Sequence, residues 1–105
     1  MTFDQVIFIR DVASIVSQIP KGKVLSYGDV AALAGFPSHS RMVGRVLASI
    51  GYDSEVPCHR VVNCLGRTAP HWHAQRKLLE TEGVTFTHTG KVDMKSYRWE
   101  IDSIG

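Results

Sequence analysis

A cysteine and a histidine stand side by side in the run Pro57-Cys58-His59-Arg60, near the middle of the chain. The thiolate form of cysteine is a strong nucleophile, and a neighbouring imidazole or cation lowers the pKa of the thiol. Proline disfavours helix for the residue before it, so Cys58 is expected on an extended or turning segment. The pair is also compatible with a half-buried structural cysteine, because free cysteine is among the most buried residue types. The surrounding residues must decide between the two.

The composition is that of a small domain without a membrane segment. The chain has 105 residues, 44% of them hydrophobic and 21% charged, with a formal net charge of +2. We expect one domain over residues 1–105, since such a chain can bury roughly two-thirds of its unfolded surface. No apolar run approaches the ~20 residues of a membrane span, and the signal-peptide layout is lacking. We therefore expect a cytoplasmic monomer with reduced cysteines and no membrane partner.

Hydrophobic spacing and helix-end signals predict three helices in the first half of the chain. A second helix starts at Ser26, with Asp29 as capping-box partner, and stops at Gly35. A third covers Ser40–Ile50, with Ser38 or Ser40 as its cap, and breaks at residues 51–54. The first helix covers residues 3–19, and its predicted core face consists of Val6, Ile9, Val12, Ala13, Val16 and Ile19.

A fourth helix is predicted over residues 72–82, followed by strand-like runs at 84–86 and 91–92 around a turn at 89–90. Two short helices joined by a tight turn and followed by a small β element are typical of a helix-turn-helix with a wing. The predicted fold is therefore α+β, mostly helical and winged-helix-like. Such helix pairs also occur in folds with no nucleic-acid role, so this pattern alone leaves DNA binding open.

The polar face of the third predicted helix favours a nucleic-acid contact. Gly44 and Ala48 are four residues apart and leave a strip poor in side chains, beside Arg41 and Arg45. Glycine inside a helix costs up to ~1 kcal/mol relative to alanine, so something should require it there. Either another helix packs closely on this strip, or a nucleic-acid backbone approaches it. Arg41 is long enough to be inserted between stacked bases.

Three segments taken together resemble a known family. They read Lys21-Gly22-Lys23-Val24-Leu25-Ser26-Tyr27-Gly28, then Arg41-Met42-Val43-Gly44, then Pro57-Cys58-His59-Arg60-Val61-Val62-Asn63. In this order and spacing they resemble the DNA-binding, catalytic domain of O6-alkylguanine-DNA alkyltransferases, over nearly the whole chain. The compact alkyltransferase-like proteins, which lack the family's N-terminal domain, are similar in their ending, which here reads Glu82-Gly83-Val84 and Tyr97-Arg98-Trp99.

The resemblance implies a single-turnover transfer chemistry. Cys58 matches the alkyl acceptor, His59 the residue that takes its proton through a water, and Glu82 the acid that orients this histidine. Arg60 belongs to the same signature. An O6-alkylguanine must leave the base stack to reach the thiolate, because its O6 is inaccessible inside a duplex. No cofactor is implied.

The resemblance also implies a DNA-binding surface. Tyr27 matches the tyrosine that turns the 3′ phosphate, and Arg41 matches the arginine that fills the vacated place in the stack. The helix Ser40–Ile50 would lie along the minor groove of double-stranded DNA. The remaining expected DNA contacts are Ser40, Gly44, Arg45 and Arg60, and the expected pocket residues are Val56, Pro57 and Trp72.

Two departures from the repair enzymes keep a second function open. Ile50 replaces an asparagine that ties the recognition helix to the active-site turn, and the loop at residues 68–73 is shorter than its counterpart. Many compact alkyltransferase-like proteins have Trp or Ala in place of the cysteine, and they hold the lesion for nucleotide excision repair proteins. The retained Cys58, His59 and Glu82 favour alkyl transfer, and the alternative is a non-catalytic lesion sensor.

A metal site is a weaker alternative for the remaining side chains. The cysteines and the nearby histidines are adequate zinc ligands. Their spacing fits no compact structural site, so no metal is expected, and no function is assigned to Cys64, His71 or His73. Trp72 is expected either to pack under the fourth helix or to form a pocket wall.

Overall fold

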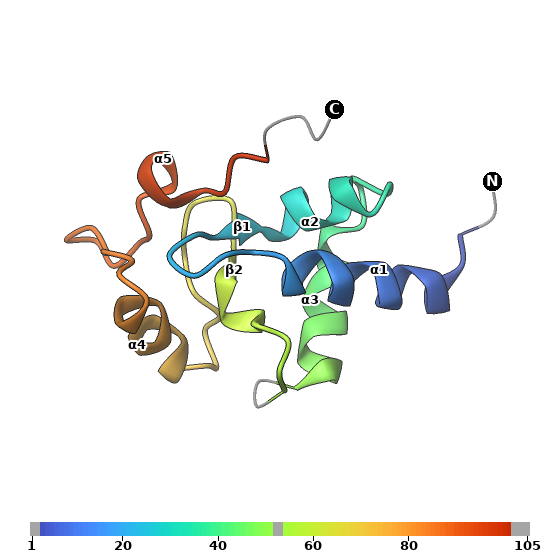
Figure 1. Ribbon diagram of the computed structural model, residues 1–105, viewed down its shortest axis with the longest axis horizontal. Helices are drawn as coiled ribbons and strands as arrows, with labels where there is room; N and C mark the ends of the chain where they lie inside the picture. The colour runs from blue at the N-terminus through green and yellow to red at the C-terminus, as the bar shows by residue number, and fades with distance from the viewer. Residues whose placement is uncertain (1–2, 52–53, 102–105) are drawn as a thin grey trace.

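The computed structural model describes residues 3–51 and 54–101 of the chain. In chain order its elements are α1 (Gln5–Ser17), β1 (Leu25–Ser26), α2 (Tyr27–Leu33), α3 (Ser40–Ile50), the 3-10 helix η1 (Cys58–Arg60), β2 (Val61–Val62), α4 (Ala74–Thr81) and α5 (Met94–Tyr97). Figure 1 shows α1, α2 and α3 gathered at one end of the molecule, with α4 and α5 at the other and the strands between them. The predicted mostly helical α+β fold is confirmed.

Helix α1 buries only part of the predicted face: Val12, Val16 and Ile19 are buried and Ala13 is partly buried. Asp4 caps it by accepting hydrogen bonds from the backbone N–H groups of Val6 and Ile7, at 3.0 and 3.2 Å. The side chains of Val6 and Ile9, which were placed in the core, are 76% and 39% exposed. Phe8 is buried instead. It packs with other rings, so the large aromatic side chain sets the rotation of the helix. The residues actually buried along this face are Phe8, Val12, Val16 and Ile19.

The predicted helix-turn-helix is formed by α2 and α3. Ser26 and Asp29 form the expected capping box, with both hydrogen bonds at 3.0 Å. Gly35 has a φ of 90°, a left-handed conformation that suits glycine and ends the helix. Helix α3 has its predicted bounds. Of the residues predicted to break it, Gly51 follows the helix with a φ of 95°, whereas Tyr52 and Asp53 lie outside the described residues.

The predicted cap of α3 is wrong. The residue at the N-cap position is His39, and no side-chain capping bond to α3 is found among the described residues. The Oγ of Ser38 bonds instead to Nδ1 of His39 at 3.2 Å. The His39 ring stacks on Phe3, with their centroids 4.7 Å apart. Ring packing has therefore replaced side-chain capping at the start of this helix.

Short parallel pairings join distant parts of the chain into a small sheet. Leu25 of β1 is paired with Val61 of β2, and Ser26 with Val62. On the preceding residue, Val24 forms a parallel bridge with Arg98. The Val24 N–H donates to the Tyr97 carbonyl at 2.9 Å, and the Trp99 N–H donates to the Val24 carbonyl at 2.8 Å. The C-terminal segment is thus bonded alongside the strand that leads into α2.

The wing is less regular than predicted. The expected strand runs are reduced to an isolated antiparallel bridge between Phe86 and Val92, and the sequence did not predict α5. Asp93 caps α5 by accepting from the Lys95 N–H at 3.1 Å. A Cβ on Gly66 would overlap the backbone of Val92, so close contact requires glycine there. Helix α4 is also shorter than the predicted 72–82, because residues 69–72 form a turn before it.

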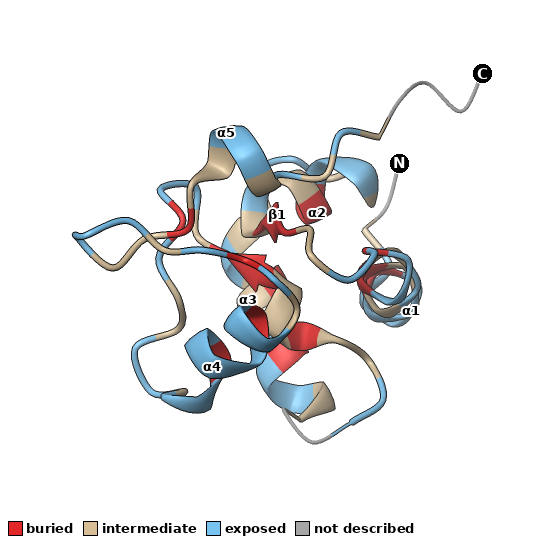
Figure 2. Cartoon of the chain, turned by 60° about the vertical axis from the view of Figure 1, so that its left-hand side comes forward, coloured by how far each residue is buried: buried red, intermediate tan, exposed pale blue. Residues whose placement is uncertain are grey.

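Two hydrophobic clusters lie on the two faces of the sheet. One contains Leu25 and Val61 with the buried faces of α1, α2 and α3, and it includes Cys58. The other contains Val24 and Val62, and its further members are Leu79, Val84 and Val92. Side chains alternate between the faces of a strand, so successive residues enter different clusters. Figure 2 shows this burial on the strands and the inner faces of the helices. No helix in the described ranges is long and apolar enough to cross a membrane.

Candidate functional site

Cys58 is a buried thiol at the start of η1. Pro57 precedes this short helix, and the cysteine is 4% exposed. Its Sγ lies 4.0 Å from the Leu47 carbonyl oxygen, to which the thiol is a weak donor. Burial raises the pKa of the Cys58 thiol, and hydrogen bonds with its own backbone and with Ser54 only partly offset this effect. Burial therefore favours the neutral thiol over the thiolate.

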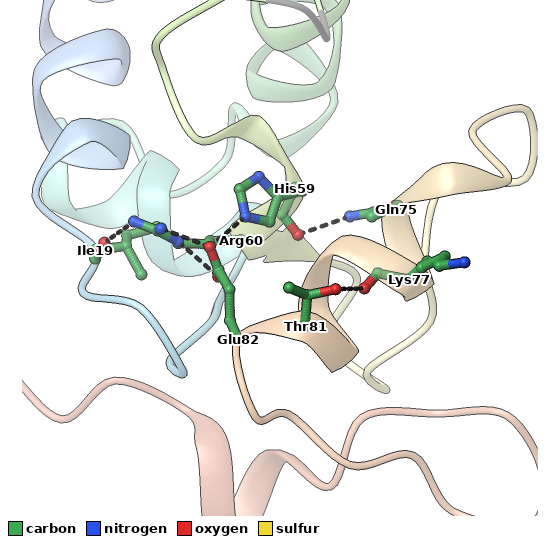
Figure 3. Close-up of polar contacts among 7 residues, drawn as sticks. All are labelled: Ile19, His59, Arg60, Gln75, Lys77, Thr81 and Glu82. Atoms are coloured by element: carbon green, nitrogen blue, oxygen red, sulfur yellow. Dashed lines mark hydrogen bonds and ion pairs between the residues drawn. The ribbon is translucent and has the colours of Figure 1, made fainter.

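His59 and Arg60, which follow Cys58 in η1, form a connected polar cluster with Glu82 (Figure 3). His59 Nε2 lies 3.0 Å from Glu82 Oε2. Arg60 binds the same carboxylate with two nitrogens, Nε to Oε1 at 2.9 Å and Nη2 to Oε2 at 2.7 Å. Its Nη1 donates to the Ile19 carbonyl at 2.7 Å. The end of α4, η1 and the segment after α1 are thereby held together.

The charge on the Glu82 carboxylate determines which ring nitrogen of His59 carries the hydrogen. Burial raises the pKa of Glu82, but hydrogen bonds from Arg60 and His59 outweigh it and lower the value to about 2. A carboxylate only accepts hydrogen bonds, so Nε2 of His59 carries the hydrogen, and Nδ1 is the basic nitrogen of the neutral ring. No hydrogen bond joins Cys58 to His59 in the part of the chain that the structure describes. Proton transfer between them would need a bridging water.

Tyr27 and Gly44 bring α2 and α3 into contact at the predicted DNA-binding surface. A Cβ built on Gly44 would lie 3.9 Å from Cε1 of Tyr27, which is an ordinary van der Waals contact. Contact with Tyr27 therefore does not require glycine at this position, and the approach of a nucleic-acid backbone to Gly44 stays a prediction. On the same helix Arg41 and Arg45 are exposed, whereas Ser40 is partly buried.

The predicted pocket residues lie around the cluster that contains Cys58. Val56 and Trp72 are partly buried against this cluster, and Pro57 is partly buried beside the cysteine. The Trp72 ring is nearly perpendicular to the His59 ring, with their centroids 6.5 Å apart. Ile50, which departs from the repair enzymes, also packs against this cluster.

Sequence reasoning missed Gln75, whose side chain is buried against η1, the short helix that begins at Cys58. Its residue exposure is 1%, and its amide contacts the backbone of both η1 and the loop before α4. The signal was its position four residues before Leu79, on the apolar face of the predicted helix. A polar residue on that face needs buried hydrogen-bond partners.

The side chains considered for zinc are dispersed. Cys58 is buried and Cys64 is exposed, and both are free thiols. His71 and His73 are exposed. Among residues 3–51 and 54–101, no group of three His, Cys, Asp or Glu side chains could hold a metal ion.

Fold and site together define a helix-turn-helix domain with a thiol that contacts its second helix and, next to the thiol in the chain, an imidazole bonded to a carboxylate. A sequence profile described as the DNA binding domain of 6-O-methylguanine DNA methyltransferase matches residues 7–84. This match covers more than half of the chain, which therefore belongs to that family.

Named relatives and solved structures fall into two groups within the family. A DNA base-flipping protein of Escherichia coli is 45% identical over 95 residues, which is 88% of this chain and 74% of the relative. A methylated-DNA–protein-cysteine methyltransferase of Methanopyrus kandleri is 42% identical over 76 residues, covering 70% of this chain and 56% of the relative. The crystal structure of Schizosaccharomyces pombe Atl1, in complex with damaged DNA containing O6-carboxymethylguanine, has a TM-score of 0.81 and 32% identity, covering 93% of this chain and 99% of that one.

Proposed function

We propose that this protein binds duplex DNA through the minor groove, flips out O6-alkylguanine and holds it beside Cys58 without repairing it. The observation that carries this proposal is the position of the thiol. Cys58 is buried, its sulfur lies 4.0 Å from the Leu47 carbonyl oxygen, and no hydrogen bond to His59 is found among the described residues. The chain covers 99% of Atl1 and 74% of the base-flipping relative. This similarity supports the sensor function over alkyl transfer, which the retained cysteine favoured.

Each part of the DNA-binding surface has a defined task in this proposal. Helix α3 follows the minor groove, and the strip at Gly44 allows its backbone to approach the DNA. Arg41 occupies the place of the extruded base, and Tyr27 contacts the adjacent phosphate. Backbone contacts then supply much of the affinity, so binding should weaken steeply with salt. Excision-repair proteins are the expected partners of the loaded complex.

Alkyl transfer to Cys58 is the second candidate, and the contact between His59 and Glu82 favours it. In that reaction the Cys58 sulfur would attack the alkyl carbon, and the bond from this carbon to O6 of guanine would break. The thiol proton would pass through water to His59, and the released guanine anion would take up a proton. The S-alkyl cysteine is stable, so each molecule would act once.

Intact-protein mass after incubation with excess duplex containing one O6-methylguanine separates the candidates. Transfer adds about 14 Da to the native chain, the mass of one methylene in S-alkylation, and nothing to Cys58→Ser. Unchanged mass with tight, lesion-selective binding is the result expected of a sensor. Unchanged mass without preference for the lesion would overturn both proposals.

A further inference from the structure

Gln75 joins three separate segments through one buried amide. Its Oε1 accepts from the Ala69 N–H at 2.7 Å, in the loop before α4. Its Nε2 donates to the His59 carbonyl at 3.1 Å and to the Val61 carbonyl at 2.9 Å. Figure 3 shows the Gln75 amide pointing from α4 toward η1. The side chain therefore bonds the loop on one side and the turn that carries Cys58 on the other.

The loop held in this way contains Trp72. The Trp72 N–H donates to the Ala69 carbonyl, and the Gln75 N–H donates to the Trp72 carbonyl, both at 3.2 Å. Backbone bonds thus fold the loop onto the start of α4, and the Gln75 side chain fixes this unit against η1. The Trp72 ring, which is set edge-on to His59, belongs to this loop.

Burial makes this attachment stiff. An amide removed from water must satisfy its donors and its acceptor, and a partner left unpaired is costly. With both ends bonded, the loop cannot move away from η1 without breaking buried hydrogen bonds. An exposed amide would impose no such restraint.

We infer that Gln75 is a positioning residue that sets the distance between the loop at 68–73 and the Cys58 turn, and so determines which O6-alkyl groups fit beside the thiol. The inference rests on the proposed function. Breaking the attachment would let the loop move away from η1 and would favour bulky O6 substituents relative to small ones.

The test compares binding to three duplexes, which are undamaged or contain O6-methylguanine or O6-benzylguanine. Gln75→Met removes all three side-chain bonds at nearly constant volume, and Gln18→Met is the control at an exposed amide directly after α1. Ala69→Pro removes the backbone N–H that donates to Gln75 and leaves the Gln75 side chain unchanged. It is the test variant to use if Gln75→Met does not fold. We expect the ratio of methyl to benzyl affinity to fall about tenfold in both test variants, equivalent to the one hydrogen bond to the loop that both of them lose, and to stay unchanged in the control.

A second readout uses no DNA. In a Cys64→Ser background, Cys58 is labelled with small iodoacetamide and with a bulky maleimide under native conditions. Loosening the loop should raise the rate with the bulky reagent more than the rate with the small one, whereas global destabilisation raises both equally. Equal rate changes, or an unchanged affinity ratio in a folded variant, would assign Gln75 to stability alone. A native chain without lesion preference contradicts the proposed function, and the labelling rates still decide the role of Gln75.

Discussion

Replacing Gly44 with alanine should make the protein more stable and a weaker DNA binder. The residue lies inside α3, and an added Cβ would meet Tyr27 at 3.9 Å, so the folded chain has room for the methyl group. Alanine is better than glycine in a helix interior by about 0.8–1 kcal/mol. For a domain of this size such a gain raises Tm by about 4–8 °C.

The DNA-bound state should respond in the opposite direction. Where the DNA backbone contacts the strip at Gly44, an extra methyl group overpacks the interface and costs about 1–3 kcal/mol. This corresponds to a ~5- to ~150-fold higher Kd. The penalty should apply to undamaged and alkylated duplexes alike, because the strip contacts backbone rather than the flipped base.

Thermal unfolding and fluorescence anisotropy with labelled duplexes measure the two effects on the same samples. Ser49→Ala is the matched control, since Ser49 is exposed on the same helix and gains helix propensity without lying on the strip. A Gly44→Ala protein that is more stable and binds as the native chain does would refute the assignment of the strip to DNA. A less stable variant would show instead that the contact with Tyr27 already requires glycine.

Two further predictions concern charge. The pKa of Glu82 is lowered from 4.5 to about 2 in the folded chain, so its contribution is complete above pH 4.5 and is lost as the pH falls toward 2. Urea unfolding should therefore show up to about 3 kcal/mol of stability that is lost in acid, and Glu82→Gln should remove this pH-dependent part. Glu80→Gln, at a half-exposed ion pair, should leave it in place. Equal acid sensitivity in both variants would contradict the role of Arg60. Arg41→Ala should reduce the affinity for alkylated duplex by more than tenfold, about the effect of removing one inserted side chain, whereas Arg10→Ala on α1 should not. Unchanged affinity of Arg41→Ala for both lesion and intact duplex would exclude Arg41 from base flipping.

The parts of the fold encoded by local signals could be predicted from the sequence. The capping box of Ser26 and Asp29 is complete within four residues, and the bounds of α3 follow from its apolar spacing. On α1 the prediction was correct for Val12, Val16 and Ile19 but wrong for Val6 and Ile9, which match the helical period as well as Phe8 does. The contacts of Phe8 with rings of Phe3 and Phe36 decide the orientation, and periodicity carries no information on such contacts.

The candidate site divides in the same way. Cys58 and His59 are adjacent, so their proximity is visible in the chain. Glu82 entered only through the family resemblance, since 23 residues separate it from His59. The partners of Gln75 are backbone groups. Every residue has a backbone carbonyl, so the sequence does not indicate which of them a side chain will bind. Its polar character on an apolar helix face indicated burial but not the two segments that it joins.

The small sheet has a consequence for how the protein folds. Its pairings link Val24 to Arg98 and Leu25 to Val61, so they close loops that span much of the chain. Contacts between residues far apart in sequence slow folding, because the entropy of loop closure is lost before the contacts form. The helices at residues 5–50 can assemble early from local contacts, whereas the turn that carries Cys58 lies directly before β2. We therefore expect α1, α2 and α3 to form in the folding chain before the turn that carries Cys58 does.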